Sequence, residues 1–267
     1  MDFELIKLEI DSQIATLSFN DPDNLNAINQ TMLDSLDLAL DHVEDPDNNI
    51  RCLILTGAGR GFCAGANMAR DPGEEDGAAS NRLADPGAGL EKFYHPLLRR
   101  LRNLHCPIVS AVNGPCAGIG MSFALMGDMV LAGKSAFFLQ AFRRIGLVPD
   151  GGATFLLPRL VGMARAKELT LMGERLSADD ALEWGLINRV FDDGELLGEA
   201  RTLADELAKG PMSLGIIRNL LWESVDSSYE EQLNNERWAQ REAGRSKDFV
   251  EGVRAFNEKR DANFSGK

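Results

Sequence analysis

The sequence predicts an α/β fold with one main core, in which short strands alternate with helices. Apolar runs such as "CLILTG" at residues 52–57 and "PIVSAVNG" at residues 107–114 end in glycine, as buried strands that turn toward a site do. Segments with apolar residues at helical spacing separate these runs, and this alternation favours parallel strands joined by helices. Only helical patterns occur after these units, so we predict a core over residues 1–194 and a helical region of the same functional unit over residues 195–267.

A hairpin and a helix come first along the chain. Residues 3–20 alternate apolar and polar side chains around a central "DSQ", which predicts two antiparallel strands joined by a turn. Residues 29–46 carry apolar side chains at helical spacing, and either Asn29 or Thr31 is placed to cap that helix. Residues 71–90 are polar, acidic and rich in glycine, which predicts a mobile surface loop.

The composition argues against several classes of function. Of the 267 residues, 44% are hydrophobic and 26% are charged, and the formal net charge is -13, so the surface is poorly suited to nucleic acid. The four cysteines lack CxxC spacing, the N-terminus does not resemble a secretion signal, and no apolar run is long enough to span a membrane. Three scattered histidines offer no metal-ligand spacing. We therefore expect a cytoplasmic protein without a metal, a nucleic-acid partner or a membrane partner.

Two glycine-rich stretches follow predicted strands. Within residues 57–68, the small residues at 64–66 would let the backbone approach a ligand closely. Residues 113–128 continue from a strand end into an apolar helix, whose first N–H groups would stabilise an oxygen that acquires negative charge. Ile119, between two glycines, is placed to present its amide there. From composition alone, a tight turn and close helix packing explain these glycines equally well.

A single acid, Asp150, stands between a proline and two glycines in "LVPDGGATFLL" at residues 147–157. Burial beside apolar residues raises the pKa of a carboxyl group, so this residue could exchange protons near neutral pH. An aspartate that precedes a helix is also a common N-cap. The residues by themselves leave both interpretations open.

Six motifs spread along the chain carry a family resemblance. They are "NLNAI", "GFCAGANM", "NGPCAGIGMSFALMGD", "GLVPDGGATFLLPRLVG", "ADDALEWGLINRVF" and "FNEKRDANFSGK". In this order they resemble the crotonase superfamily of enoyl-CoA hydratases and isomerases. The resemblance implies a ββα spiral core, a C-terminal helical region that makes trimer contacts, and a homotrimer or dimer of trimers. It also implies an acyl-CoA thioester as substrate, so coenzyme A is part of the substrate and no separate cofactor is expected.

The resemblance assigns roles to residues near the two glycine-rich stretches. Carried over by position, the backbone N–H groups of Ala66 and Ile119 form an oxyanion hole that holds the thioester oxygen as an enolate forms. Ala64, Gly65 and Gly118 then border the path of the bound acyl-CoA. In addition, the family's C-terminal segment often approaches the nucleotide, which makes Lys259 a candidate ligand of the CoA phosphates or, equally, a solvated lysine.

Two positions depart from the pattern of the family's hydratases. Where those enzymes carry two glutamates, this sequence has Ser122 and Phe142, which we place among the substrate-binding residues. Phe142 cannot exchange a proton, and the Ser122 hydroxyl needs an activating partner to act as a base. Asp150 stands where hydratases typically have glycine and some isomerases of the superfamily have a catalytic aspartate. The surrounding motif looks especially like that of the ring-1,2-epoxyphenylacetyl-CoA isomerases and 3-enoyl-CoA isomerases.

These observations predict an isomerase that shifts a double bond or opens a ring epoxide in a CoA thioester. Asp150 is the expected acid/base, and Ala66 and Ile119 are the expected donors to the enolate oxygen. Two alternatives stay open at this point. One is an enoyl-CoA hydratase, and the other is a family member without catalysis that binds acyl-CoA or RNA.

Overall fold

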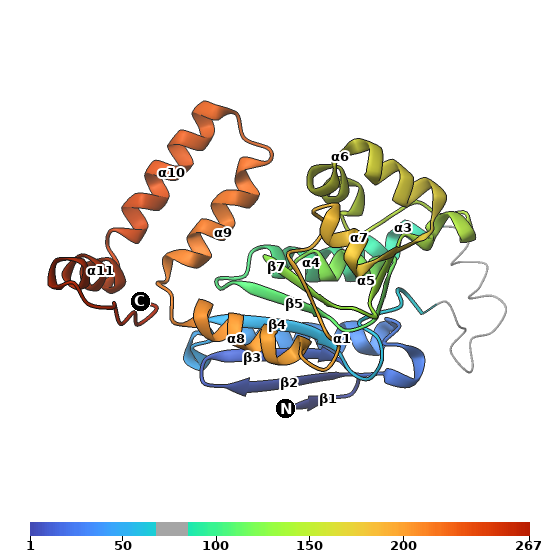
Figure 1. Cartoon of the computed structure of the whole chain (residues 1–267), viewed down its shortest axis with the longest axis horizontal. Coiled ribbons are helices and arrows are strands. Elements are labelled where there is room, and N and C mark those ends of the chain that lie inside the picture. The colour runs from blue at the N-terminus through green and yellow to red at the C-terminus, as the bar shows by residue number, and fades with distance from the viewer. Residues whose placement is uncertain (68–84) are drawn as a thin grey trace.

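Two β-sheets and the helices around them form the body of the structure (Figure 1). The computed structural model describes residues 1–67 and 85–267. Within these ranges, seven strands form a large sheet in the order β1-β2-β3-β4-β5-β7-β10, and three form a small sheet in the order β6-β8-β9. The strands are β1 (Asp2–Phe3), β2 (Ile6–Asp11), β3 (Ile14–Phe19), β4 (Cys52–Gly57), β5 (Ile108–Val112), β6 (Pro115–Ala117), β7 (Met129–Gly133), β8 (Phe137–Leu139), β9 (Arg175–Ser177) and β10 (Arg189–Phe191).

The large sheet is antiparallel at one edge and parallel elsewhere. β1, β2 and β3 pair antiparallel, whereas β3, β4, β5, β7 and β10 run parallel to their neighbours. Every residue of β4 and β5 is buried, as expected for parallel strands whose two faces are covered by other elements. This confirms the prediction of buried strands at residues 52–57 and 107–114.

The chain passes repeatedly from the large sheet to the small one. β5 is followed by β6 and then by the helix α5 (Ile119–Ala124), and β7 is followed by β8, the 3-10 helix η4 (Ala141–Ile145) and the helix α6 (Ala153–Met172). β4 is likewise followed by Cys63, which forms an isolated parallel bridge with Cys116 of β6. This repeated path of strand, strand and helix confirms the predicted α/β spiral core.

The predicted hairpin and first helix are also confirmed. Ser12 and Gln13 form the turn between β2 and β3, and both have positive φ angles, of 54° and 82°. The first long helix begins after Asn29, whose side chain accepts a hydrogen bond from the N–H of Met32, so Asn29 rather than Thr31 is the cap. The remaining elements before residue 195 are η1 (Pro22–Asn24), α1 (Gln30–Glu44), η2 (Pro46–Asn48), α3 (Pro86–Gly89), η3 (Leu90–Tyr94), α4 (His95–Arg102) and α7 (Ala178–Glu183).

The predicted loop over residues 71–90 is wrong at its C-terminal end. Most of it, residues 71–84, lies outside the described residues. The last part is helical, because the Asp85 side chain accepts hydrogen bonds from two N–H groups at the start of α3 and proline stands at its first position. From there the chain continues helically through η3, a π-helical segment, into α4.

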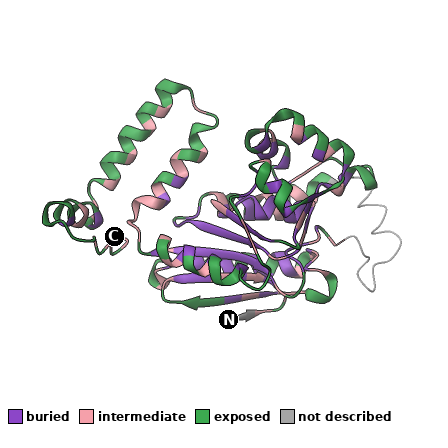
Figure 2. Ribbon diagram, in the orientation of Figure 1, coloured by how far each residue is buried: buried purple, intermediate pink, exposed green. Residues whose placement is uncertain are grey.

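Four helices make up most of residues 195–267: α8 (Leu196–Ala208), α9 (Ser213–Ser224), α10 (Tyr229–Ala243) and α11 (Lys247–Glu258). The helical prediction for this region is therefore confirmed. α8 packs on the large sheet through a row of buried apolar residues that includes Leu196 and Leu203. The part that projects from the core in Figure 1 is α9, α10 and α11, which we call the arm. Figure 2 shows that buried residues concentrate in the two sheets and α5, whereas the arm is largely exposed.

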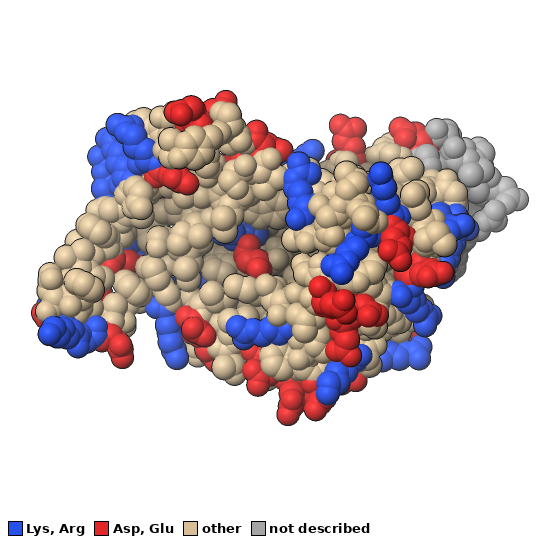
Figure 3. Space-filling view, turned by 45° about the horizontal axis from the view of Figure 1, so that its top comes forward, with Lys and Arg blue, Asp and Glu red and all other residues tan. Residues whose placement is uncertain are grey.

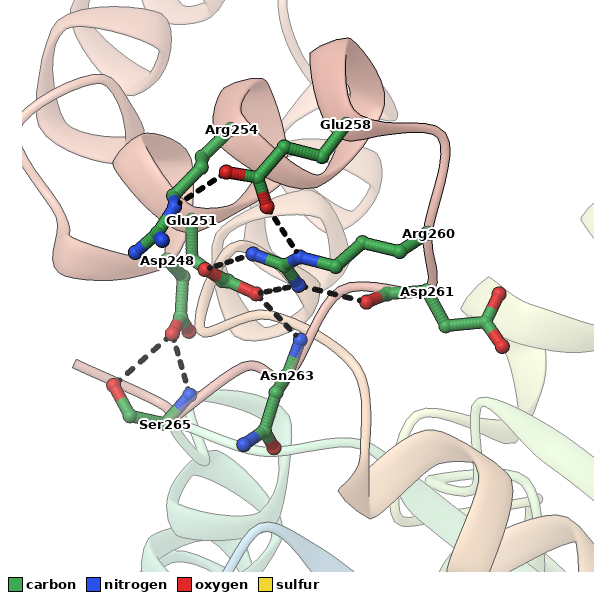
Figure 4. A network of polar contacts seen from close by, with 8 residues as sticks. All are labelled: Asp248, Glu251, Arg254, Glu258, Arg260, Asp261, Asn263 and Ser265. Carbon is green, nitrogen blue, oxygen red and sulfur yellow. Dashed lines mark hydrogen bonds and ion pairs between the residues drawn. The ribbon is translucent and has the colours of Figure 1, made fainter.

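The last residues of the chain fold back onto α11 (Figure 4). Asp248, which is 1% exposed, accepts hydrogen bonds from the N–H groups of Met212, Ser265 and Gly266. Burial opposes ionisation of this carboxyl group, but these hydrogen bonds outweigh it and lower its pKa. Arg260, just after α11, forms ion pairs with Glu251 and Glu258 of that helix. The tail thus holds the arm in a defined shape.

Charged side chains of both signs are scattered among uncharged residues on the face of the molecule shown in Figure 3. On the face shown in Figure 3, Lys and Arg side chains occur in separate groups with acidic residues between them, and no continuous basic stripe crosses that face. Among the described residues, every helix is too short or too polar to cross a membrane.

Candidate active site

The first glycine-rich stretch forms a turn and a short extended segment after β4. Two buried or half-buried amides hold the turn, because Asn26 donates to the carbonyls of Ala58 and Gly61, and Asn113 donates to those of Gly57 and Gly59. The extended segment then pairs with β6. This arrangement fixes the backbone of residues 62–66 at the carboxyl ends of two parallel strands, which is the usual place for a site in such sheets.

The two glycine-rich stretches meet at Gly65 and Gly118. Their φ angles are 105° and 52°, in the region that favours glycine. A Cβ atom added to Gly65 would lie 3.1 Å from the carbonyl oxygen of Ala117, and one added to Gly118 would lie 3.9 Å from the Cα atom of Gly65. Close backbone contact and conformation therefore both favour glycine at position 65, whereas at position 118 the positive φ angle favours it.

The residues that follow these glycines carry free backbone donors. Within the described part of the chain, the N–H groups of Ala66 and Ile119 donate no hydrogen bond. Ile119 is the first residue of α5, so its N–H has no partner within the helix, and Ala66 is solvent-exposed. Two unpaired donors, one on an extended segment and one at the start of a helix, can stabilise a developing oxyanion.

Asp150 lies between η4 and α6 and does not cap the helix. The N-cap of α6 is Gly152, and no side chain caps this helix, so the alternative that Asp150 is an N-cap is wrong. One carboxylate oxygen, Oδ1, is buried and has no hydrogen-bond partner among the described residues. Burial raises the pKa of Asp150 to about 6, and a hydrogen bond with its own backbone opposes this shift. A half-buried carboxyl group of this kind changes protonation near neutral pH.

Gly151 places the aspartate beside the first turn of α5. Its φ angle is 58°, and a Cβ atom added to it would lie 2.3 Å from Cδ1 of Ile119 and 2.7 Å from Cβ of Ser122. The backbone on the C-terminal side of Asp150 is therefore in contact with the helix whose first amide is the proposed oxyanion donor. This contact fixes the Asp150 turn relative to that donor, as a base that serves an enolate held there requires.

At the two positions where the family's hydratases carry glutamates, this chain has side chains without a carboxyl group. The Phe142 ring is 8% exposed, and a Cβ atom on Gly118 would lie 3.5 Å from it. Ser122 is fully buried, and its hydroxyl donates a 3.0 Å hydrogen bond to the backbone carbonyl of Asp150. The structure thus brings both residues to the junction of α5, η4 and the Asp150 turn.

Most of the predicted site residues come together, but Lys259 does not. Lys259 ends α11 in a left-handed conformation with φ of 56°, and α11 lies at the far end of the arm from α5 and α6 (Figure 1). The residues that the structure gathers around the two glycine-rich stretches and the Asp150 turn are Ala64, Gly65, Ala66, Gly118, Ile119, Ser122, Phe142 and Asp150.

Two cysteines adjoin the site without contributing a nucleophile. Cys63 and Cys116 are both fully buried, and burial raises the pKa of Cys63 to about 12 and that of Cys116 well above its usual value. A thiol with such a pKa stays protonated at neutral pH. Their small side chains instead fill the space where the two glycine-rich stretches meet, since a Cβ atom on Gly120 would lie 2.7 Å from the Cys63 sulfur.

Comparison with known proteins identifies the family. The family model described as enoyl-CoA hydratase/isomerase matches residues 9–267. The chain belongs to the enoyl-CoA hydratase/isomerase family. It is 46% identical to a 1,2-epoxyphenylacetyl-CoA isomerase from Escherichia coli, with 99% of each chain covered, and 37% identical to a probable enoyl-CoA hydratase from Rhodobacter capsulatus over the full length of both. A solved structure of an enoyl-CoA hydratase subunit I from Geobacillus kaustophilus, 30% identical, superimposes with a TM-score of 0.88 and full coverage of both chains. Membership of the enoyl-CoA hydratase/isomerase family makes the protein an acyl-CoA enzyme.

Proposed function

We propose that the protein is an acyl-CoA isomerase, which shifts a double bond or opens a ring epoxide in a CoA thioester, with Asp150 as the single acid/base. The observation that carries this proposal is one carboxyl group with a raised pKa and an unpartnered oxygen, on a turn that packs against α5, the helix that begins with one of the two free backbone donors. The relative that is named an epoxyphenylacetyl-CoA isomerase supports it.

The double-bond shift needs one base and one oxyanion hole. The Asp150 carboxylate takes a proton from the α-carbon of a 3-enoyl thioester, and the electrons of that C–H bond move into the thioester carbonyl to give an enolate. The N–H groups of Ala66 and Ile119 stabilise the negative oxygen. The protonated Asp150 then returns the same proton to the γ-carbon, which leaves a 2-enoyl thioester and regenerates the carboxylate. No oxidant, water or metal enters this balance.

The hydratase alternative has weaker support at the same positions. Hydration needs a group that activates water, but Phe142 has none and the Ser122 hydroxyl donates to a backbone carbonyl. Several relatives are nevertheless named as hydratases, such as the probable enoyl-CoA hydratase from Rhodobacter capsulatus. Hydratase activity is therefore the alternative that an experiment must test.

The purified protein is expected to isomerise 3-enoyl-CoA or ring-epoxide CoA esters and to hydrate 2-enoyl-CoA at least about 100-fold more slowly. The three classes of ester are offered side by side, and products are separated by mass and retention time, because isomers keep the substrate mass and hydration adds one water. Hydration of crotonyl-CoA faster than either isomerisation would contradict the proposal. Binding of all three esters without any turnover would also contradict it.

We also propose that the arm mediates assembly into a homotrimer or a dimer of trimers. α11 exposes apolar side chains that a monomer would leave in water, with Phe256 83% and Val250 66% exposed. The arm also contains an apolar groove of about 600 Å³ between its three helices. If Lys259 binds the CoA phosphates, assembly must bring an arm close to a site, because the two lie apart within one chain.

Light scattering is expected to give a mass three or six times that of the 29.2 kDa chain. The Phe256→Glu variant is expected to shift the mass toward the monomer, since it places a charge in the buried part of the interface. Asp47→Asn, on an exposed position of the core, serves as the control and is expected to keep the mass of the wild type. A monomeric wild-type protein would exclude the assembly.

A further inference from the structure

We propose that Ser122 is a positioning residue that fixes Asp150 relative to the oxyanion hole, an inference that rests on the proposed isomerase function. Ser122 is 0% exposed, and its Oγ atom donates a hydrogen bond of 3.0 Å to the Asp150 carbonyl. The two residues are 28 positions apart in the sequence, so this bond joins α5 to the segment that carries the acid.

The bond links the acid to the oxyanion donor through one helical turn. Ile119 begins α5, and Ser122 follows three residues later on the same face of the helix. The path from the proposed donor to the acid therefore consists of one rigid turn of buried helix and one hydrogen bond. The proposed reaction requires the α-carbon of the substrate to reach the base while the two backbone donors hold the thioester oxygen. It therefore depends on a fixed separation between the Asp150 turn and Ile119.

The Asp150 carbonyl is held from two sides. Besides Ser122, the N–H of Ala153 in the first turn of α6 donates to it, also at 3.0 Å. Two donors occupy both acceptor directions of a carbonyl oxygen and fix the orientation of its peptide group. Gly151 then packs directly on α5, where a Cβ atom would lie 2.9 Å from the Ser122 hydroxyl oxygen. The turn is therefore pinned both by hydrogen bonds and by close contact.

This arrangement gives a physical reason for serine at a position where family hydratases carry a glutamate. A glutamate side chain has three more heavy atoms than serine, and the Gly151 backbone already packs against Ser122. A short hydroxyl fits that space and satisfies the carbonyl. The position thus supports the acid/base instead of supplying a carboxyl group.

Removal of this hydroxyl is expected to slow isomerisation without weakening substrate binding. The Ser122→Ala variant should lower kcat by about tenfold to about 100-fold, with KM unchanged within about twofold, because the acid is misplaced but the backbone donors remain. The looser turn should also admit water to Asp150, so the pKa of its carboxyl group, read by carbon NMR, should fall from about 6 toward the ordinary value of 3.8. The Ser122→Cys variant keeps a weaker donor, so its kcat and its Asp150 pKa should lie between those of Ser122→Ala and those of the wild type.

Ser110→Ala is the matched control, because Ser110 is also fully buried but its hydroxyl has no partner within the described residues. It is expected to leave kcat and the Asp150 pKa unchanged. A Ser122→Ala variant that keeps both the wild-type kcat and the wild-type pKa would overturn the positioning role while the isomerase function stands. If the wild type does not isomerise these esters, the proposed function fails, and the NMR titration still decides whether Ser122 holds the Asp150 turn.

Discussion

The Asp150→Asn variant is expected to lose isomerisation by about 1,000-fold in kcat, within the range that general acid/base catalysis contributes. Asparagine has almost the same shape as aspartate, so the two backbone donors and the turn around Gly151 should remain in place. Its amide cannot accept a proton from the α-carbon at neutral pH. Because the oxyanion hole still binds the thioester, KM should change by no more than about threefold.

The pH dependence provides a second readout of the same residue. The active form of Asp150 is the carboxylate, so kcat/KM of the wild type should rise with pH and level off above about 6, where this group ionises. An ordinary aspartate would give a limb near its usual pKa of 3.8, well below this. The residual activity of the asparagine variant should lack the limb near pH 6. The asparagine variant should also fail to exchange the α-proton of the substrate with deuterated water, since the same base removes that proton.

Asp47→Asn makes the same change of charge at an exposed position and should leave both rate and pH profile as in the wild type. If Asp150→Asn retains the wild-type rate, the acid/base lies elsewhere and the mechanism proposed above is wrong. If the wild-type rate has no acid limb near pH 6 but Asp150→Asn is inactive, the residue acts through structure instead of proton transfer.

Much of the fold could be predicted because local patterns and tertiary packing agree in the core. Strands β4 and β5 are buried on both faces, so their sequences are almost wholly apolar and end where the chain turns. Asn29 is both a good capping residue and correctly placed before an amphipathic helix. The loop prediction is wrong for residues 85–90 because the Asp85 side chain caps a helix that begins within glycine-rich sequence.

The candidate site was predictable only in part. The sequence before α6 is compatible with both a helix cap and a catalytic acid at position 150. In the structure, the two glycines that follow have φ angles of 58° and 84°, and they turn the backbone so that Asp150 does not cap the helix. The bond from Ser122 to Asp150 depends on the packing of two segments far apart in the chain. No local sequence pattern predicts such a contact, so only the resemblance to a family predicts that these residues share one site.

The Arg218→Met variant is expected to lower the free energy of unfolding by about 3–5 kcal/mol, the usual effect of removing one partner from a buried ion pair. Arg218 on α9 is 4% exposed and donates to the carboxylate of Asp128 at 2.7 Å. It also donates to three backbone carbonyls around the end of α4. Methionine fills similar volume, so the loss reflects an unpaired acid and unpaired carbonyls more than a cavity.

Asp128 makes this loss depend on pH. Burial raises the pKa of its carboxyl group, while Arg218 and the N–H of Ile108 oppose the shift. Without Arg218 the folded-state pKa rises further above the unfolded value. A group whose pKa is raised on folding stabilises the protein below its unfolded pKa and loses that stabilisation as the pH increases through the folded pKa. The stability gap between Arg218→Met and wild type should therefore narrow as the pH falls toward the ordinary aspartate pKa of about 4.

Two further variants separate the ion pair from a general loss of packing. Adding Asp128→Asn to Arg218→Met removes the unpaired charge and should recover part of the stability lost at neutral pH. Arg201→Met, on α8, breaks a more exposed pair with Asp11 and should leave the unfolding midpoint within experimental error. If Arg218→Met loses no more than Arg201→Met, the Arg218–Asp128 pair does not stabilise the fold. Because α9 is the first helix of the arm, confirmation would show that one buried guanidinium anchors the arm to the core.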